Sequence, residues 1–421
     1  METKREPTGQ FLPLDEVDKK LEYLERLERY WKDYFPSLTG EPRDRYKPFH
    51  QIVIATVMMM DINTLRELAS VSLPRIQRQY IIRRFLQDLM VMPCFVKMVI
   101  TKKSLKDEAR EDSNKQKVVD DLITRVRVDR AILDNHRCIV LGTENPEICH
   151  IVPFSVNDDD KSRAQFEKYL VMAATCIYSE KPELAADPES TPEDTDAADM
   201  AGNLTDDDIT VDSPSTDGGL DDAEIELARL ELWATLCRKV SSSKTGVSDR
   251  SWNEISLNKQ LHDWWSKGYF AFKPLGIDGK IVKGLGPKGD TARYTQVKLQ
   301  FHWMPRRDDI ASTATPLNKT YGDPEANGLN PVLSQDRESS VFHRVQTGDI
   351  FYVKVEHRYA ERMLAAFRIK WAAINILSMA GGAESLDDVG DYPEYLDENL
   401  NWMGDVKRGT TVLDLMKEWD D

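Results

Sequence analysis

Long apolar runs and clustered cysteines are both missing from this chain of 421 residues. No stretch approaches the roughly eighteen consecutive apolar residues that a membrane-spanning helix requires, and no apolar segment follows the charged N-terminus METKREPTGQ as a secretory signal would. The five cysteines are scattered and include no CxxC pair, which argues against a disulfide framework. We therefore expect an intracellular protein, cytoplasmic or nuclear, that is neither secreted nor inserted in a membrane.

Positive charge is absent from one long segment. Between Pro182 and Asp222 there are fourteen Asp or Glu residues and no Lys or Arg, out of a net charge of −16 for the whole chain. The remainder therefore carries about −2 (16 − 14), and it contains local basic clusters such as residues 125–130. The acidic balance thus does not exclude a nucleic-acid partner. Low hydrophobicity and unbalanced charge predict that residues 181–221 are disordered.

The spacing of apolar residues predicts both helices and strands. In residues 15–31 apolar side chains recur at three- and four-residue steps, which indicates an amphipathic helix that could pack on the domain or self-associate. Further helical patterns cover residues 50–70, 75–90, 115–133, 161–179, 222–240 and 359–380, the last of which ends at Gly381-Gly382. Alternation of apolar and polar residues predicts strands near 297–303 and 351–355, separated by a loop over 305–338.

Two stretches combine turn signals with residues that can carry chemistry. The first is CIVLGTENPEICHIVPFS, residues 138–155, in which Cys149 and His150 stand side by side. The second is WNEISLNKQLHDWWSKGYFAFKP, residues 252–274. There the pattern predicts a strand over 254–257, an N-cap at Asn258, a short helix, Gly268 just past its end and extended chain beyond.

This second stretch places polar residues at both ends of a strand-turn-helix unit. Asn253 lies at the entrance of the strand and His262 lies in the early turns of the helix. We expect the unit to pack against an earlier strand that carries His150. Trp264 and Trp265 in the helix could stack on bases, but packing of the helix against a sheet is the ordinary role of such residues.

The order His150, Asn253, His262 resembles the His-Asn-His signature of HNH endonucleases. The phrases CIVLGTENPEICHIVPFS, SLNKQLHDWWSKGYFAFKPL, RYTQVKLQFHWMP and MAGGAES are similar to fungal HNH-domain proteins. This resemblance covers about residues 120–304, and 345–385 more loosely. The gap of 103 positions (253 − 150) is longer than in compact HNH nucleases, so the intervening helices and acidic segment would be an insertion in a loop.

The resemblance implies a metal-dependent endonuclease that hydrolyses phosphodiester bonds of nucleic acid, with DNA as the default substrate. His150 would be the general base, because a neutral imidazole can accept the proton of the attacking water near neutral pH. Asn253 would orient the base or touch the metal, and His262 would be a metal ligand, while the cation neutralises charge on the leaving oxygen. Residues that could hold the phosphate are Arg137, Lys259 and Lys267.

Cys149 departs from the pattern of many active HNH enzymes, which have Asp, Glu or His directly before the base. A thiolate offers little to a hard cation such as magnesium, whereas a softer ion such as zinc or nickel could use it as a second ligand. Without the surrounding motif, Cys149 would be interpreted as a small residue of the core. Cys138, Cys149, His150 and His262 could instead form a structural zinc site. The alternative function is that of a catalytically inactive HNH-fold module that binds nucleic acid or protein.

The expected architecture belongs to the α+β class. It comprises a ββα-metal HNH module with an N-terminal helical region and a C-terminal strand and helix extension. The boundaries are 1–115 for the N-terminal helical region, 116–304 for the HNH-like domain with its insertion, 305–340 for a loop, 341–390 for the C-terminal extension and 391–421 for a tail.

Overall fold

The protein mixes helices and antiparallel sheets, and it is therefore α+β. The computed structural model describes residues 14–34, 51–60, 62–63, 65–66, 75–100, 127–153, 166, 169, 251–286, 291–305, 333–335, 342–381 and 386. The acidic segment 181–221, the helix expected over 222–240, the tail 391–421 and nearly all of 161–179 lie outside these residues. None of the described helices combines the length and apolarity needed to cross a membrane.

The described part of the N-terminal region contains the helices α1 (Leu14–Tyr34), α2 (Gln51–Met59) and α4 (Arg75–Ile100). The expected amphipathic helix is confirmed as α1, and it packs on α2 and α4. Its buried Lys20 donates a hydrogen bond of 3.1 Å from Nζ to the carbonyl oxygen of Met58, near the end of α2. Helix α4 runs ten residues past the expected end and contains Pro93, because the apolar residues around this proline are buried.

The strands in the described part of the chain form three small sheets. Strands β1 (Glu147–His150) and β2 (Glu254–Leu257) make an antiparallel pair that leads into α9 (Lys259–Ser266). A second sheet has the order β3-β4-β7, with β3 (Phe270–Leu285), β4 (Thr291–Trp303) and β7 (Ile350–Glu356). The third pairs β5 (Leu333–Gln335) with β6 (Phe342–Arg344), so part of the expected loop is extended. Single turns precede β2 and follow β7: η4 (Ser251–Asn253) and η5 (His357–Tyr359).

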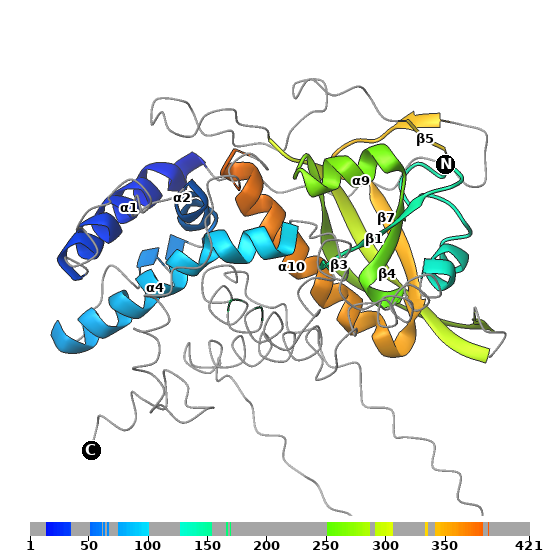
Figure 1. The fold of residues 1–421 in the computed structure, drawn as a ribbon, viewed down its shortest axis with the longest axis horizontal. Helices are drawn as coiled ribbons and strands as arrows, with labels where there is room; N and C mark the ends of the chain where they lie inside the picture. The colour runs from blue at the N-terminus through cyan, green and yellow to red at the C-terminus, as the bar shows by residue number, and fades with distance from the viewer. Residues whose placement is uncertain are drawn as a thin grey trace, which may run out of the picture.

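Helix α10 (Ala360–Met379) joins the helical and the sheet parts of the molecule. It packs against α2 and α4 on one side and against β3 on the other, and Figure 1 shows it between the two parts. A helix in this position has apolar side chains on more than one face, and most of its residues are buried. Its buried Lys370 donates to the carbonyl oxygen of Val99 at 2.9 Å, and the same ammonium group lies 5.2 Å from the Trp265 ring centroid.

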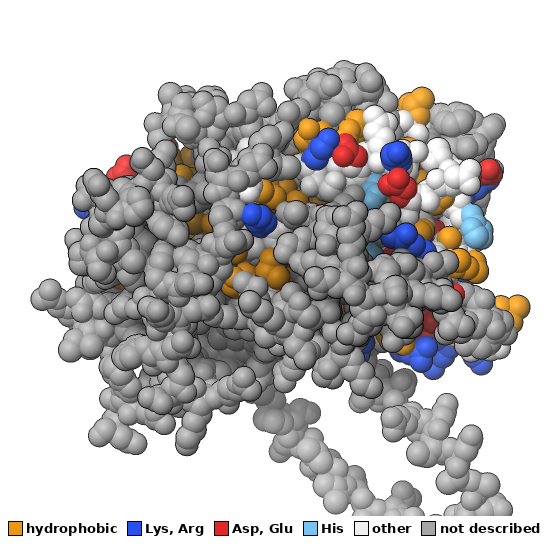
Figure 2. All heavy atoms as spheres, viewed as in Figure 1, with side chains coloured by type: hydrophobic (Ala, Val, Ile, Leu, Met, Phe, Trp, Pro, Cys, Tyr) orange, Lys and Arg blue, Asp and Glu red, His pale blue; other side chains and the backbone are white. Residues whose placement is uncertain are grey.

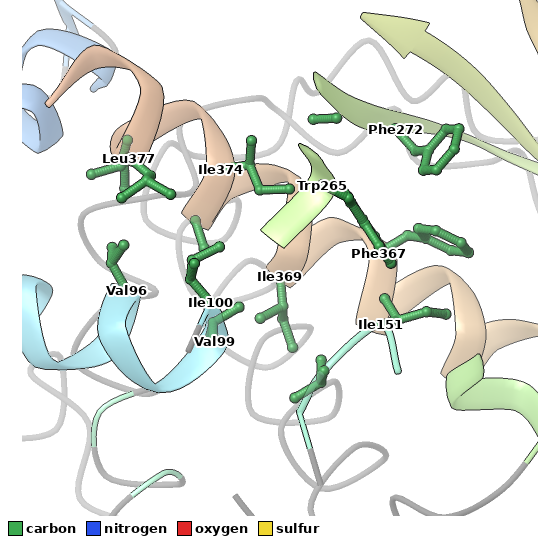
Figure 3. Packing of buried hydrophobic residues seen from close by; sticks show 14 of the residues in the cluster. Val96, Val99, Ile100, Ile151, Trp265, Phe272, Phe367, Ile369, Ile374 and Leu377 are labelled. Atoms are coloured by element: carbon green, nitrogen blue, oxygen red, sulfur yellow. The ribbon is translucent and has the colours of Figure 1, made fainter. Parts of the chain in front are cut away.

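One continuous apolar core results from this arrangement. Figure 3 shows side chains of α4, α10, α9 and β3 meeting within it, among them Val96, Leu377, Trp265 and Phe272. Trp265 makes an edge-to-face contact with Phe272, with ring centroids 5.9 Å apart. Trp264 does the same with Trp303 at 6.0 Å. Both tryptophans therefore have the packing role, which fixes α9 against the larger sheet.

Candidate functional site

The β1–β2 pair places His150 beside a buried carboxylate. In the antiparallel register His150 lies directly opposite Glu254, and residues opposite each other project from the same face. The imidazole Nε2 is 3.5 Å from Oε1 of Glu254, whose side chain is only 1% exposed, while His150 is 19% exposed. A partly accessible imidazole thus rests against a carboxylate that bulk water hardly reaches.

Asn253 ties the two strands together just beyond this pair. Its side chain is fully buried; Nδ2 donates to the carbonyl oxygen of Val152 at 2.8 Å, and Oδ1 accepts from the Val152 amide at 3.0 Å. The backbone adds a third bond, from the Ile151 amide to the Asn253 carbonyl oxygen at 2.7 Å. A side-chain amide suits this reciprocal pairing, because its donor and its acceptor are on separate atoms. The side chain therefore fixes the backbone two residues after His150.

Helix α9 positions His262 through ordinary capping. The side chain of Asn258 accepts a hydrogen bond of 2.9 Å from the amide of Gln260, as expected for an N-cap. Gly268 has a φ of +73°, the left-handed conformation that glycine supplies at a helix end. Within the helix, Nδ1 of His262 lies 2.7 Å from Oε2 of Glu147 at the start of β1. The helix is thus fastened to the hairpin by a histidine-carboxylate contact.

A buried ion pair bonds to the backbone of β2 and of its neighbours η4 and β7. Arg130 and Asp134 lie one turn apart at the C-terminal end of the helix that is described from residue 127, and both are almost fully buried. Oδ2 of Asp134 accepts a hydrogen bond from the Ser256 amide of β2 at 3.1 Å. The Arg130 guanidinium donates to the carbonyl oxygens of Ser251 at 3.3 Å and Lys354 at 3.0 Å. Its charge is balanced by Asp134, and the pair connects η4, β2 and β7.

The two histidines of the expected site have different partners. Three positions separate Glu147 from His150, so their side chains project from opposite faces of β1. His262 contacts Glu147 on one face, whereas His150 contacts Glu254 on the other. The structure therefore brings each imidazole to a carboxylate, and Asn253 holds the backbone of Val152 just after β1.

These residues supply only part of the ligand set that a divalent metal needs. The contact between His262 Nδ1 and Glu147 is the arrangement by which proteins orient an imidazole for metal binding through its other nitrogen. Cys149, however, is 1% exposed and belongs to the apolar core, and its thiol donates to the carbonyl oxygen of Glu147 at 3.5 Å. Among the residues that the structure describes, no three His, Cys, Asp or Glu side chains are placed to hold one ion. These residues do not by themselves complete a metal site.

Cys138 lies in the turn that leads into β1. Its sulfur accepts a hydrogen bond of 3.3 Å from the Leu141 amide, and its backbone exchanges bonds with Gly142 and Thr143. Burial raises the pKa of the Cys138 thiol above its ordinary value, which favours the neutral form over a metal-binding thiolate. In the described part of the chain the cysteine is a turn-stabilising residue.

The three residues expected to hold phosphate are all at the surface. Arg137 pairs with Glu144 at 3.3 Å, and Lys267 pairs with Asp263 at 2.9 Å. Lys259 is exposed in the first turn of α9. Exposed ion pairs of this kind are weak, so both partnered side chains can be redirected to an anion at little cost.

Sequence reasoning missed both carboxylates that accompany the histidines. Glu254 is an acidic residue in a strand whose four positions are all buried, and such a charge inside an apolar pattern is a signal that could have been recognised. Glu147 gave no such signal, because it is a half-exposed residue at a strand end. Its partner His262 is 115 positions away, a pairing that only the fold creates.

Comparison of the chain with protein-family models, with curated proteins and with solved structures found no match.

Proposed function

We propose that the chain hydrolyses phosphodiester bonds of nucleic acid, with DNA as the substrate, and that β1, β2 and α9 form an HNH-type ββα module. The observation that carries the proposal is the placement of the ordered trio in one strand-strand-helix unit. His150 ends the first strand, Asn253 enters the second and His262 lies in the helix. Each of the three has a specific polar partner, which simple packing of apolar elements would not require.

His150 is the general base in this proposal. An imidazole accepts the proton of a water molecule as that water attacks phosphorus, and it becomes positively charged in doing so. The Glu254 carboxylate, 3.5 Å from His150, stabilises the imidazolium and holds the ring in one orientation. Asn253 acts one step further away, since it fixes the backbone of Val152 and thereby the end of β1.

His262 and Glu147 have a separate role, on the face of β1 that α9 covers. If a divalent cation binds, His262 is the side chain oriented to hold it, on the face of β1 opposite to that of His150. The described residues do not complete such a site.

A plasmid nicking assay tests the proposal. Supercoiled DNA is incubated with the full-length protein in magnesium, manganese, zinc, nickel or a chelator, and the open-circle product is quantified. We expect His150→Ala to lower the rate by a factor on the order of 100 or more, and added imidazole to restore part of it. Glu254→Gln should reduce the rate less.

His343→Gln provides the matched control. This histidine lies in β6, which pairs with β5 and not with the β1–β2 hairpin, so its loss should leave cleavage unchanged. Undiminished cleavage by His150→Ala would remove the assigned mechanism. Circular dichroism of each variant separates lost chemistry from lost folding.

A binding module without catalysis is the second candidate, favoured by the burial of Cys149 at the position before the proposed base. A module of this kind would bind duplex DNA on the same surface but would not cut the plasmid, whichever metal ion is added. Salt-dependent binding without any nicking would support this candidate over the nuclease.

A further inference from the structure

The far end of the β3–β4 hairpin extends beyond the sheet to which it belongs. Strand β7 pairs with β4 only from Gln300 to Tyr294, so no third strand among the described residues lies beside the last pairs of the hairpin. Residues 278–283 are all exposed, in contrast to the buried start of β3. This end projects from the sheet part of the molecule (Figure 1). We call the segments 276–285 and 291–298 the distal hairpin.

The distal hairpin is basic, unlike the chain as a whole. It contains four basic residues and one acidic residue, Asp278. Lys283 and Arg293 lie directly opposite each other in the register and are both exposed. Like charges at opposite positions destabilise a strand pair, and within the described part of the chain no ion pair involves either residue. A bound anion between them would relieve this repulsion.

Three apolar side chains of the distal hairpin are also open to solvent. Ile281, Val282 and Leu285 are 39%, 51% and 76% exposed. Basic side chains gather at the same end of the molecule (Figure 2). Side chains that neutralise phosphates, combined with apolar groups that contact sugars or base edges, match the needs of a nucleic-acid surface better than those of a purely polar ligand.

We infer that the distal hairpin is an arm that binds duplex DNA. A two-stranded antiparallel ribbon has the width that the major groove admits, and its exposed basic residues complement the phosphates along the groove edges. The identity of the polyanion rests on the proposed function, whereas the surface itself rests on charge, register and exposure. Lys280, Lys283 and Arg293 are the principal phosphate-binding residues of this arm.

The arm and the candidate site are mechanically connected. The guanidinium of Arg130 donates to the carbonyl oxygen of Ser251, two residues before Asn253, and to that of Lys354 in β7. Lys354 lies opposite Gln296 of β4, within the distal hairpin. One buried side chain thus bonds to β7, which pairs with the β4 strand of the arm, and to the turn that enters β2. A duplex held by the arm is thereby kept in a fixed relation to the hairpin that carries His150.

Binding measurements on a non-cleaving background test the arm separately from catalysis. Full-length His150→Ala protein is titrated with a fluorescent duplex of about 30 base pairs over a range of salt concentrations. Replacing Lys280, Lys283 and Arg293 together with glutamine should reduce the magnitude of the slope of log K against log salt by about 2.7, which is about 0.9 for each phosphate that is no longer neutralised. Leu285→Ser should weaken binding without changing this slope.

Three exposed basic residues elsewhere form the matched control: Lys19 and Arg29 of α1, and Arg66. Their replacement with glutamine removes the same charge but should leave the slope unchanged. Equal slopes for the two triple variants would overturn the inference. Polyglutamate binding as tight as duplex binding would overturn the nucleic-acid assignment.

The nicking assay distinguishes the two proposals. If the wild type nicks DNA normally and the triple arm variant keeps the wild-type salt slope, the inference about the arm is wrong and the nuclease proposal stands. If the wild type fails to nick DNA but the triple arm variant has a reduced salt slope, the inference about the arm stands and the nuclease proposal is wrong.

Discussion

Two antiparallel strand pairs of the protein, β1–β2 and β3–β4, share the same backbone pairing but differ in what surrounds them. The β1–β2 pair has four residues in each strand, and β2 is buried throughout, even at Glu254 and Ser256. The β3–β4 pair is three to four times as long, and only its first part is buried, whereas its distal part is exposed and basic. A short hairpin enclosed by other elements can hold polar groups in fixed positions. A long one that extends past its sheet offers an adaptable surface instead.

The difference originates in what covers each hairpin. Helix α9 packs against β1, and the buried Asp134 bonds to the β2 backbone. Helix α10 covers the first part of β3, and β7 stops pairing at Tyr294. Covered positions tolerate a polar residue only when it has a partner, which explains why each polar side chain of the candidate site has one.

Matched leucines give the largest expected contrast between the hairpins. Leu257 in β2 is fully buried, whereas Leu285 in β3 is 76% exposed. We expect Leu257→Ala to lower the free energy of unfolding by about 4 kcal/mol, because it leaves a cavity in the core. Leu285→Ala should change it by less than about 0.5 kcal/mol. Urea unfolding followed by tryptophan fluorescence measures both, and similar losses would show that the distal hairpin is part of the stable core.

The clamp between the strands of the short hairpin can be removed by Asn253→Ala. This change leaves the amide and carbonyl groups of Val152 buried without their side-chain partners, which should cost about 2 to 3 kcal/mol of unfolding free energy. The control is Asn258→Ala, which removes an N-cap at the protein surface and should cost about 1 kcal/mol. If the control lost more stability than Asn253→Ala, the clamp would not be the main link between β1 and β2.

The buried end of the long hairpin should respond to acid through His302 in β4. Burial, assisted by the nearby Lys273, lowers the pKa of His302 from 6.5 to about 3, and its Nε2 lies 2.9 Å from Oε1 of Gln300. The unfolded chain therefore binds a proton between pH 6.5 and 3 that the folded chain does not. This contribution to stability is complete above pH 6.5 and is lost as the pH falls.

The expected slope from this residue is at most about 1.4 kcal/mol of unfolding free energy per pH unit. Unfolding curves at pH 7.5, 6.5, 5.5 and 4.5 for the wild type and for His302→Gln measure it. The variant should lose less stability per pH unit than the wild type. Parallel pH dependences for the two proteins would show that His302 takes up its proton in the folded state.

Local signals in the sequence were sufficient for the elements of the candidate site. The bounds of β2, the N-cap at Asn258 and the glycine after α9 were all predicted, and the structure confirms them. Each depends on residues within a few positions of one another, where backbone preferences and capping act directly. The entrance position of Asn253 followed from the same reasoning.

Long-range pairings could not be predicted in this way. Glu254 is separated from His150 by about a hundred residues, and Glu147 from His262 by 115, so no local pattern links the partners. The same limit applies to α10, whose sequence indicated a helix but not its position between α4 and β3. The extension of α4 past Pro93 was missed because tertiary burial offset the loss of one backbone hydrogen bond.

The hydrogen bonds between Asn253 and Val152 also determine when the site can exist during synthesis. They join residues that are 101 positions apart in the chain. A ribosome that adds roughly 5 to 20 residues per second needs on the order of 5 to 20 seconds to proceed from one partner to the other. The strand that carries His150 therefore emerges well before the residues that fix its geometry. A nascent chain of this protein has no assembled site until the second hairpin strand and its helix have left the ribosome.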